Sequence, residues 1–150
     1  MVVTYSNKVV VFGGRDASDN DLCCTQIFDT TQNQWSTRSD MPEVCSFGAA
    51  VTLNDCIYVV GGYHRTCLKY EPDSDTWTRL SRPELQHGCG PAVVWRGSVL
   101  VAGGEDDEEQ QSPVIEQYNP HTDTWSVYRS AQLEEPMSCH YIFNIDLYDS

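Results

Sequence analysis

The side chains that could do chemistry are scattered along this 150-residue sequence instead of forming one motif. His64 and Cys67 have the HxxC spacing of a metal-ligand pair, but no second pair with ligand spacing accompanies them. The run Asp73-Ser74-Asp75 faintly resembles a calcium loop, yet Asp and Ser are also the residues that turns prefer. Because both patterns are incomplete, the sequence predicts no metal ion and no other cofactor.

Catalytic patterns are equally incomplete. The glycine pair Gly61-Gly62 does not predict a phosphate site, because neither GxGxxG nor GxxxxGK follows it. No spacing argues for a nucleophile beside its base, so no catalytic residue is predicted. The densest charge is the five-carboxylate run from Glu105 to Glu109, which is typical of a solvated loop. If that run meets a ligand, its charge favours a basic one.

Composition argues against several classes of function. Acidic residues outnumber basic ones by 22 to 9, giving a formal net charge of −13, so binding to nucleic acid or an anionic membrane is not expected. No apolar run approaches the roughly 20 residues of a membrane span. The N-terminus lacks the basic start and apolar core of a signal peptide. Seven cysteines, an odd number with no CxxC pair, favour reduced thiols and a cytoplasmic location.

The elements that must position these residues form a threefold repeat. Each copy has an apolar run ending in two glycines, then an aromatic residue, a polar turn and a Trp. The aromatic residue precedes its Trp by seven positions in every copy, and each Trp precedes the next copy's glycine pair by 26. The copies are VVVFGG with Phe28 and Trp35, CIYVVGG with Tyr70 and Trp77, and SVLVAGG with Tyr118 and Trp125. This fixed register predicts a repeat architecture in preference to an ordinary β-sandwich.

Each copy contains four short segments that are rich in β-branched and aromatic residues and separated by turn residues, as β-strands are. The predicted strands are 1–5, 9–12, 25–28 and 34–38, then 47–53, 56–60, 67–70 and 76–80, then 90–95, 98–102, 114–118 and 124–128, with a further strand at 139–145. No window keeps a 3.6-residue apolar period for three turns, so we expect an all-β fold. The glycine pairs indicate positive φ or close backbone approach, and the aromatic residues are large enough to fill the space between sheets.

The order of aliphatic run, Gly-Gly, Tyr or Phe, and Trp resembles the kelch repeat over nearly the whole chain. The resemblance implies kelch-type β-propeller blades, each a four-stranded antiparallel sheet from inner strand A to outer strand D. Blades are expected at 1–38, 45–80 and 87–128, with 139–145 as a closing strand or the first strand of a next blade. Propellers close with about four to eight blades. Three blades and one strand therefore predict an incomplete propeller, the C-terminal part of a longer protein.

The sequence is most similar to the kelch domains of BTB–kelch (Kelch-like) proteins. This resemblance implies a protein-interaction module without enzyme activity, which recognises substrates for a cullin-RING ubiquitin ligase through a BTB domain outside this sequence. Two alternatives stay open. One is a kelch scaffold that binds cytoskeletal or other proteins without a ligase role. The other is a propeller oxidoreductase, since some kelch propellers carry a copper site and a fold does not fix a function.

The topology of a blade predicts where a protein or peptide would bind. In an antiparallel blade the B–C and D–A connections share one face, and the first and third B–C loops are about six residues longer than the second. Variable loops on a repetitive scaffold commonly carry recognition. The predicted contact residues are Arg15, Asp16, Ser46, Tyr63, His64, Arg65, His87, Glu105 and Asp106. Kelch adaptors often carry Arg-Ser at two D–A positions that here are Cys45-Ser46 and His87-Gly88, which argues against an acidic ligand.

Overall fold

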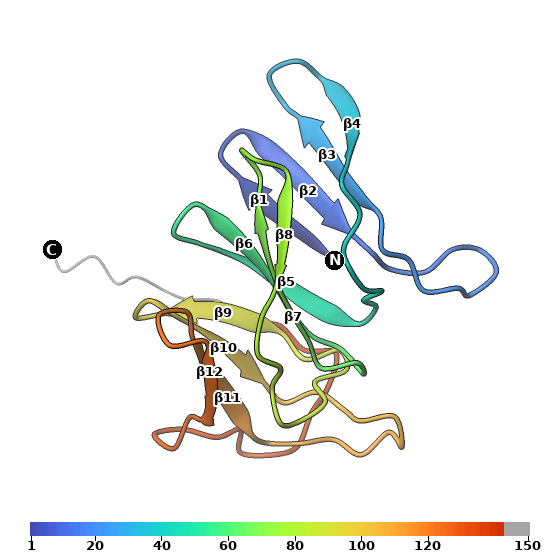
Figure 1. Cartoon of the computed structure of the whole chain (residues 1–150). Coiled ribbons are helices and arrows are strands. Elements are labelled where there is room, and N and C mark those ends of the chain that lie inside the picture. The colour runs from blue at the N-terminus through green and yellow to red at the C-terminus, as the bar shows by residue number, and fades with distance from the viewer. Residues whose placement is uncertain (143–150) are drawn as a thin grey trace, which may run out of the picture.

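The computed structural model describes residues 1–142 and contains three four-stranded antiparallel sheets, as Figure 1 shows. The predicted all-β fold is therefore confirmed. No helix in the described part of the chain is long and apolar enough to cross a membrane. Of the further strand predicted at 139–145, residues 139–142 are not in a strand, and residues 143–145 lie outside the described residues.

We call the sheets blades 1, 2 and 3 in chain order, and within each blade the strands follow the order of the sequence. Blade 1 contains β1 (Val2–Tyr5), β2 (Lys8–Phe12), β3 (Thr25–Asp29) and β4 (Gln34–Arg38). Blade 2 contains β5 (Gly48–Leu53), β6 (Cys56–Gly61), β7 (Thr66–Glu71) and β8 (Thr76–Arg79). Blade 3 contains β9 (Ala92–Trp95), β10 (Ser98–Ala102), β11 (Ile115–Asn119) and β12 (Thr124–Val127).

Tight turns join the first two strands of each blade. Asn54 and Asp55 have φ of 50° and 58°, and Arg96 and Gly97 have φ of 49° and 75°. Two successive positive φ values define the turns that best match the twist of a two-residue hairpin. These turns and the β3–β4, β7–β8 and β11–β12 turns lie on one side of the molecule, while the long loops after β2 and β10 project from the other (Figure 1).

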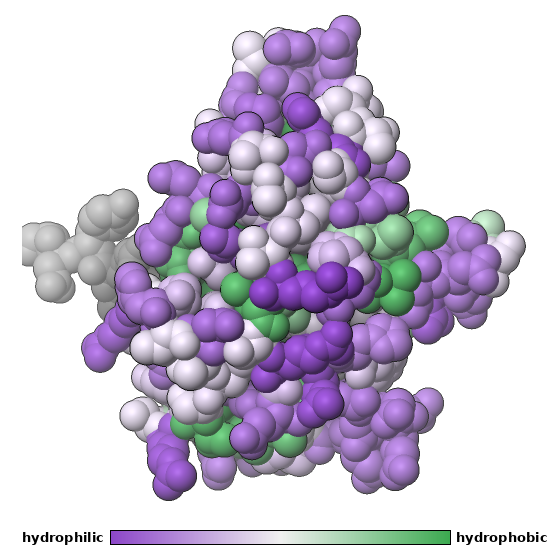
Figure 2. Space-filling model, in the orientation of Figure 1, coloured by the Kyte–Doolittle hydropathy of each residue, from purple (hydrophilic) through white to green (hydrophobic). Residues whose placement is uncertain are grey.

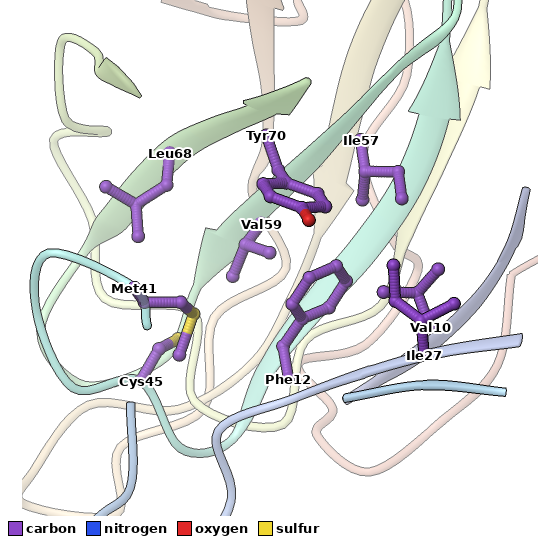
Figure 3. Close-up of a cluster of buried hydrophobic side chains, with 9 residues drawn as sticks. All are labelled: Val10, Phe12, Ile27, Met41, Cys45, Ile57, Val59, Leu68 and Tyr70. Carbon is purple, nitrogen blue, oxygen red and sulfur yellow. The ribbon is translucent and has the colours of Figure 1, made fainter. Parts of the chain in front are cut away.

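Neighbouring blades pack through aromatic and aliphatic side chains. Between blades 1 and 2, the ring of Phe12 lies edge-on to the rings of Tyr70 and Trp77, with centroids 5.9 and 5.3 Å away. Figure 3 shows Phe12, Tyr70 and Val59 converging with Met41 and Cys45 in this core. The aromatic residues of the repeat therefore fill the space between sheets, as the sequence indicated.

In blades 2 and 3, the aromatic pair also fastens its blade to the preceding one. The Tyr70 hydroxyl donates to Asp75 at 2.7 Å, and Asp75 accepts the backbone N–H of Ser39 at 3.1 Å. The Trp77 indole N–H donates to the carbonyl of the same Ser39 at 2.9 Å. The same bonds recur one blade later among Tyr118, Asp123, Trp125 and Ser81, at 2.8, 2.9 and 2.7 Å. We call this arrangement the Tyr–Asp–Trp clamp.

The glycine pairs allow the chain to pass close to the segment that leads into the next blade. Gly62 has φ of 71°, and a Cβ there would lie 2.6 Å from the carbonyl oxygen of Ser46. Gly13 has φ of 50°, and a Cβ there would lie 2.3 Å from the carbonyl oxygen of Cys45. A larger residue is excluded at these positions for two reasons: its side chain would disfavour the positive φ, and its Cβ would clash with the neighbouring carbonyl oxygen.

Candidate functional site

The glycine pairs join the B–C loops to the D–A segments on one face, which we call the loop face. The B–C loops are residues 13–24, 62–65 and 103–114, and the D–A segments are residues 39–47, 80–91 and 128–139. One backbone hydrogen bond recurs at each junction: Gly14 to Cys45, Gly62 to His87 and Gly104 to Met137, at 3.1, 3.1 and 2.8 Å from nitrogen to oxygen. These bonds hold the variable loops at fixed positions relative to the blades.

The two long B–C loops have the same internal structure. In the first, one carboxylate oxygen of Asp16 accepts the backbone N–H groups of Ser18 and Asn20 at 2.8 and 2.9 Å. The side-chain hydrogen bond from Asn20 is the largest cause that holds the pKa of Asp16 below its usual value, and the backbone N–H of Asn20 is the next. In the third blade Asp106 accepts the N–H groups of residues 108 and 110, both at 2.9 Å. Asp16 and Asp106 were predicted to contact a partner, but in both loops the carboxylate instead accepts backbone N–H groups and fixes the shape of the loop.

Aromatic side chains occupy the centre of the loop face. The rings of Phe47 and Tyr63 lie 5.3 Å apart, and the guanidinium of Arg15 lies over the Phe47 ring at 4.8 Å. The Tyr63 hydroxyl donates to Oε1 of Glu105 at 2.8 Å, and Ser138 donates to its other oxygen at 2.7 Å. The structure thus brings three predicted residues from three blades, Arg15, Tyr63 and Glu105, into one line of contacts. We call Arg15, Phe47, Tyr63 and Glu105 the central line.

Phe47 is a member of the central line that the sequence did not predict. It is 38% exposed although it is aromatic, and its backbone has φ of 57°. Positive φ is uncommon for a bulky residue, and residues with such unfavourable backbone conformations cluster at functional sites. The signal that could have found it is its place directly after Cys45-Ser46, in the segment already expected to contact a partner.

Acidic side chains flank Arg15 on its outer side. Its Nε donates to Asp21 at 2.9 Å, and another guanidinium nitrogen donates to Asp19 at 3.2 Å. The Ser46 hydroxyl, followed by the Arg15 guanidinium, lowers the pKa of Asp21, so this carboxylate stays charged. His64 lies on the same side, with Nε2 at 3.6 Å from Asp21. The cation of Arg15 is therefore largely balanced by its own loop.

Arg65, the remaining exposed residue of the predicted set, lies beside the central line. Arg65 donates to the carbonyl of Glu84 at 3.2 Å, and Gln86 donates to the carbonyl of Tyr63 at 2.9 Å. A polar hollow of about 390 Å³ is lined by Arg65, Gln86 and Asp106, among others. Hydrophilic side chains cover most of the two long B–C loops, as Figure 2 shows.

Two predicted contact residues lie inside the molecule. Ser46 is 3% exposed and His87 is fully buried, so neither side chain is available to a partner from outside. Both ring nitrogens of His87 are already engaged, one with Gly103 and the other with Glu116. Gly88 pairs with Glu105, and a Cβ there would lie 2.4 Å from the Tyr63 ring. Position in the D–A segment was therefore insufficient to predict exposure, because these segments also form the seam between blades.

Two further observations bear on chemistry at this face. Within residues 1–142, no three His, Cys, Asp or Glu side chains are arranged so that they could hold a metal ion. Three equivalent positions, Phe47, Cys89 and Cys139, line an open hollow of about 550 Å³ beside the innermost strands. The loop face therefore offers an exposed aromatic centre, the guanidinium groups of Arg15 and Arg65, and several carboxylates, which suit contact with another surface.

Three fanned four-stranded antiparallel sheets, of which the second and third are each fastened to the one before, define successive blades of a β-propeller. The family model described as "Kelch motif" matches residues 2–42, 45–84 and 88–131. Since these matches cover most of the sequence, the chain belongs to the kelch-repeat family, and the resemblance noted from the sequence is confirmed.

Curated relatives of this chain are named Kelch-like proteins. The chain is 32% identical over 122 residues to Kelch-like protein 35 of Mus musculus, covering 81% of this chain and 21% of that protein. It is 30% identical over 132 residues to Kelch-like protein 38 of Danio rerio, covering 83% of this chain and 22% of that protein. The chain thus spans about a fifth of the length of these relatives.

A solved structure shows the same fold at lower sequence identity. The structure of YjhT aligns with a TM-score of 0.71 and 14% identity, covering 85% of this chain and 49% of that one. The alignment therefore extends over most of this chain but about half of YjhT.

Proposed function

We propose that this chain is a protein-binding module and that a protein or peptide partner contacts the loop face. The observation that carries the proposal is the central line. Phe47 is an exposed aromatic ring whose backbone carbonyl accepts the N–H of Cys89, and Arg15 and Tyr63 flank it. Rigid aromatic residues with an arginine beside them are the side chains that dominate protein interfaces.

The proposed partner segment combines an apolar side chain with a basic one. The apolar group would pack on Phe47 and Tyr63, while the basic group would face Glu105 or the carboxylates of the third B–C loop. The net charge of −13 supports this choice, since an acidic segment would be repelled as it approached. The positions without arginine, Cys45-Ser46 and His87-Gly88, support the same preference.

We further propose that the module recognises substrates for a cullin-RING ubiquitin ligase as part of a BTB–kelch adaptor in the cytoplasm. Similarity to Kelch-like proteins over more than four-fifths of the chain supports this role. A kelch scaffold without a ligase role is the competing proposal, and the two differ in what the longer protein assembles with. In both, the loop face binds and does no chemistry of its own.

Affinity capture with the full-length protein that contains this chain tests the proposal. Wild-type bait is compared with Arg15→Ala and Tyr63→Ala, and with His121→Ala as a matched control in the exposed turn on the opposite face. We expect partners lost from both loop-face variants and retained by the control. Recovery of a cullin supports the ligase role, whereas a filament protein without a cullin supports the scaffold. Equal partner recovery by all baits would contradict the loop face as the binding surface.

A further inference from the structure

Two cysteines that are 50 residues apart in the sequence are neighbours at the centre of the loop face. Phe47, Cys89 and Cys139 occupy equivalent places in successive D–A segments, with φ of 57°, 55° and 55°. The N–H of Cys89 donates to the carbonyl of Phe47 at 2.8 Å, and the N–H of Cys139 donates to the carbonyl of Cys89 at 3.0 Å. Because the repeat hydrogen-bonds each such position to the next, cysteines at two successive positions must lie side by side.

The two residues also share one surface. Both line the 550 Å³ hollow beside the innermost strands. Burial, followed by the neighbouring Cys139 thiol, raises the pKa of Cys89 to about 11, whereas the side chain of Cys139 is exposed. An exposed thiol with a second thiol beside it is the arrangement in which oxidation ends as a disulfide.

We propose that Cys89 and Cys139 form a reversible disulfide when the protein meets a peroxide, making this pair a redox modification site on the loop face. The sulfur of Cys139 attacks one peroxide oxygen, the O–O bond breaks, and water leaves as Cys139 becomes a sulfenic acid. The sulfur of Cys89 then attacks the sulfur of Cys139, the S–O bond breaks, and a second water leaves with the Cys89 proton. Two thiols lose two electrons in total to one peroxide, and a dithiol reductant reverses the change.

The disulfide would join the two segments that hold Glu105. Gly88, next to Cys89, exchanges backbone hydrogen bonds with Glu105 at 2.8 and 2.9 Å. Ser138, next to Cys139, donates its hydroxyl to the Glu105 carboxylate at 2.7 Å. Oxidation would thus fix Glu105 and, through it, Tyr63. The effect on partner binding rests on the proposed function, but formation of the disulfide does not, so the two can fail separately.

Peptide mapping of the intact chain tests the pair. The protein is treated with hydrogen peroxide under native conditions, free thiols are blocked, and the digest is analysed without reduction. We expect one predominant crosslink, Cys89 to Cys139, which disappears in C89S and in C139S and after treatment with dithiothreitol. C23S is the matched control, because Cys23 is half-buried in blade 1 and should leave the crosslink unchanged.

Hydrogen exchange gives a second measurement that needs no partner. The peptide containing Glu105 should exchange more slowly after oxidation of the wild-type chain, with no such change in C139S. If a serine variant does not fold, the crosslink map of the wild-type chain decides alone. The proposal is overturned if Cys139 is recovered as sulfinic acid without a link to Cys89. It is also overturned if the native chain gives crosslinks spread among the other cysteines, in the same pattern as a sample oxidised in urea.

Discussion

Nε2 of His87 lies 2.8 Å from Oε2 of Glu116, and both side chains are almost completely buried, at 0% and 1% exposure. Nδ1 of the same ring lies 2.5 Å from the carbonyl oxygen of Gly103. Both ring nitrogens therefore face acceptors. The Glu116 carboxylate also accepts the N–H groups of Glu84 and Leu85 at 3.1 and 2.9 Å. This pair holds the D–A segment between blades 2 and 3. At the equivalent position between blades 1 and 2, apolar side chains make the contact instead.

The pair predicts acid sensitivity. Burial alone raises the pKa of Glu116, but hydrogen bonds from His87 and the two backbone amides outweigh it, so the pKa lies below the ordinary 4.5. A lowered pKa in the folded state means that the stabilisation is complete above the ordinary value and is lost as the pH falls through the folded value. Glu116→Gln should reduce the free energy of unfolding at neutral pH by about 2 kcal/mol.

Urea denaturation at several pH values measures this effect. The difference between wild type and Glu116→Gln should shrink as the pH falls below about 4.5, because the wild-type carboxylate then becomes protonated too. Glu108→Gln, which changes an exposed loop carboxylate, is the control and should stay close to wild type at every pH. A difference that stays constant down to the acid range would contradict a charged Glu116.

The clamp predicts unequal roles for equivalent tryptophans. Trp77 packs on Tyr70 with ring centroids 4.6 Å apart and on Phe12 at 5.3 Å, whereas Trp35 is 58% exposed. Trp77→Ala should lower the free energy of unfolding by about 3 kcal/mol, as for large aromatic residues at packed sites. Trp35→Ala should cost about 1 kcal/mol or less, because little of its surface is removed from water. Chemical denaturation of both variants checks this, and equal losses would show that the assignment of blade packing is wrong.

The repeat explains why the fold could be predicted from the sequence. Phe28, Tyr70 and Tyr118 keep a constant distance from their tryptophans because each pair lies directly opposite across two strands, as with Tyr70 and Trp77. All twelve strands of the three blades lie within two residues of their predicted bounds. A pattern that recurs in register constrains strand, turn and packing together.

The candidate site was less predictable, because neighbouring positions on one segment serve different purposes. Ser46 is buried and Phe47 is exposed, and the difference comes from the positive φ of Phe47, which the sequence does not reveal for a bulky residue. His87 is buried because Glu116, 29 residues later, provides a carboxylate where blade 2 has Leu68. Such a pairing between distant positions cannot be inferred from spacing alone.

A single hydroxyl in the clamp can be tested by substitution. Blade 1 has Phe28 at the position of Tyr70, so Tyr70→Phe should be accommodated as a ring and lose only its bond to Asp75. That bond is the first cause of the lowered pKa of Asp75, and its loss should cost about 1–2 kcal/mol of unfolding free energy. A double-mutant cycle with Asp75→Asn isolates the pair. Additive effects of the two substitutions would indicate that the bond contributes nothing to stability.

The bond between Tyr63 and Glu105 can be observed directly by titration. The Glu105 carboxylate, followed by burial, raises the pKa of Tyr63 from 10.0 to about 12, because a phenolate could not donate to it and would be repelled. Glu105→Gln should therefore return the Tyr63 pKa towards its ordinary value, while Tyr63→Phe should remove this titration altogether. The difference between the ultraviolet titration curves of wild type and Tyr63→Phe, over the alkaline range in which the fold persists, isolates this one phenol. An ordinary pKa for Tyr63 in the wild-type chain would show that the two residues are not bonded in solution, and the central line would then lack its connection to blade 3.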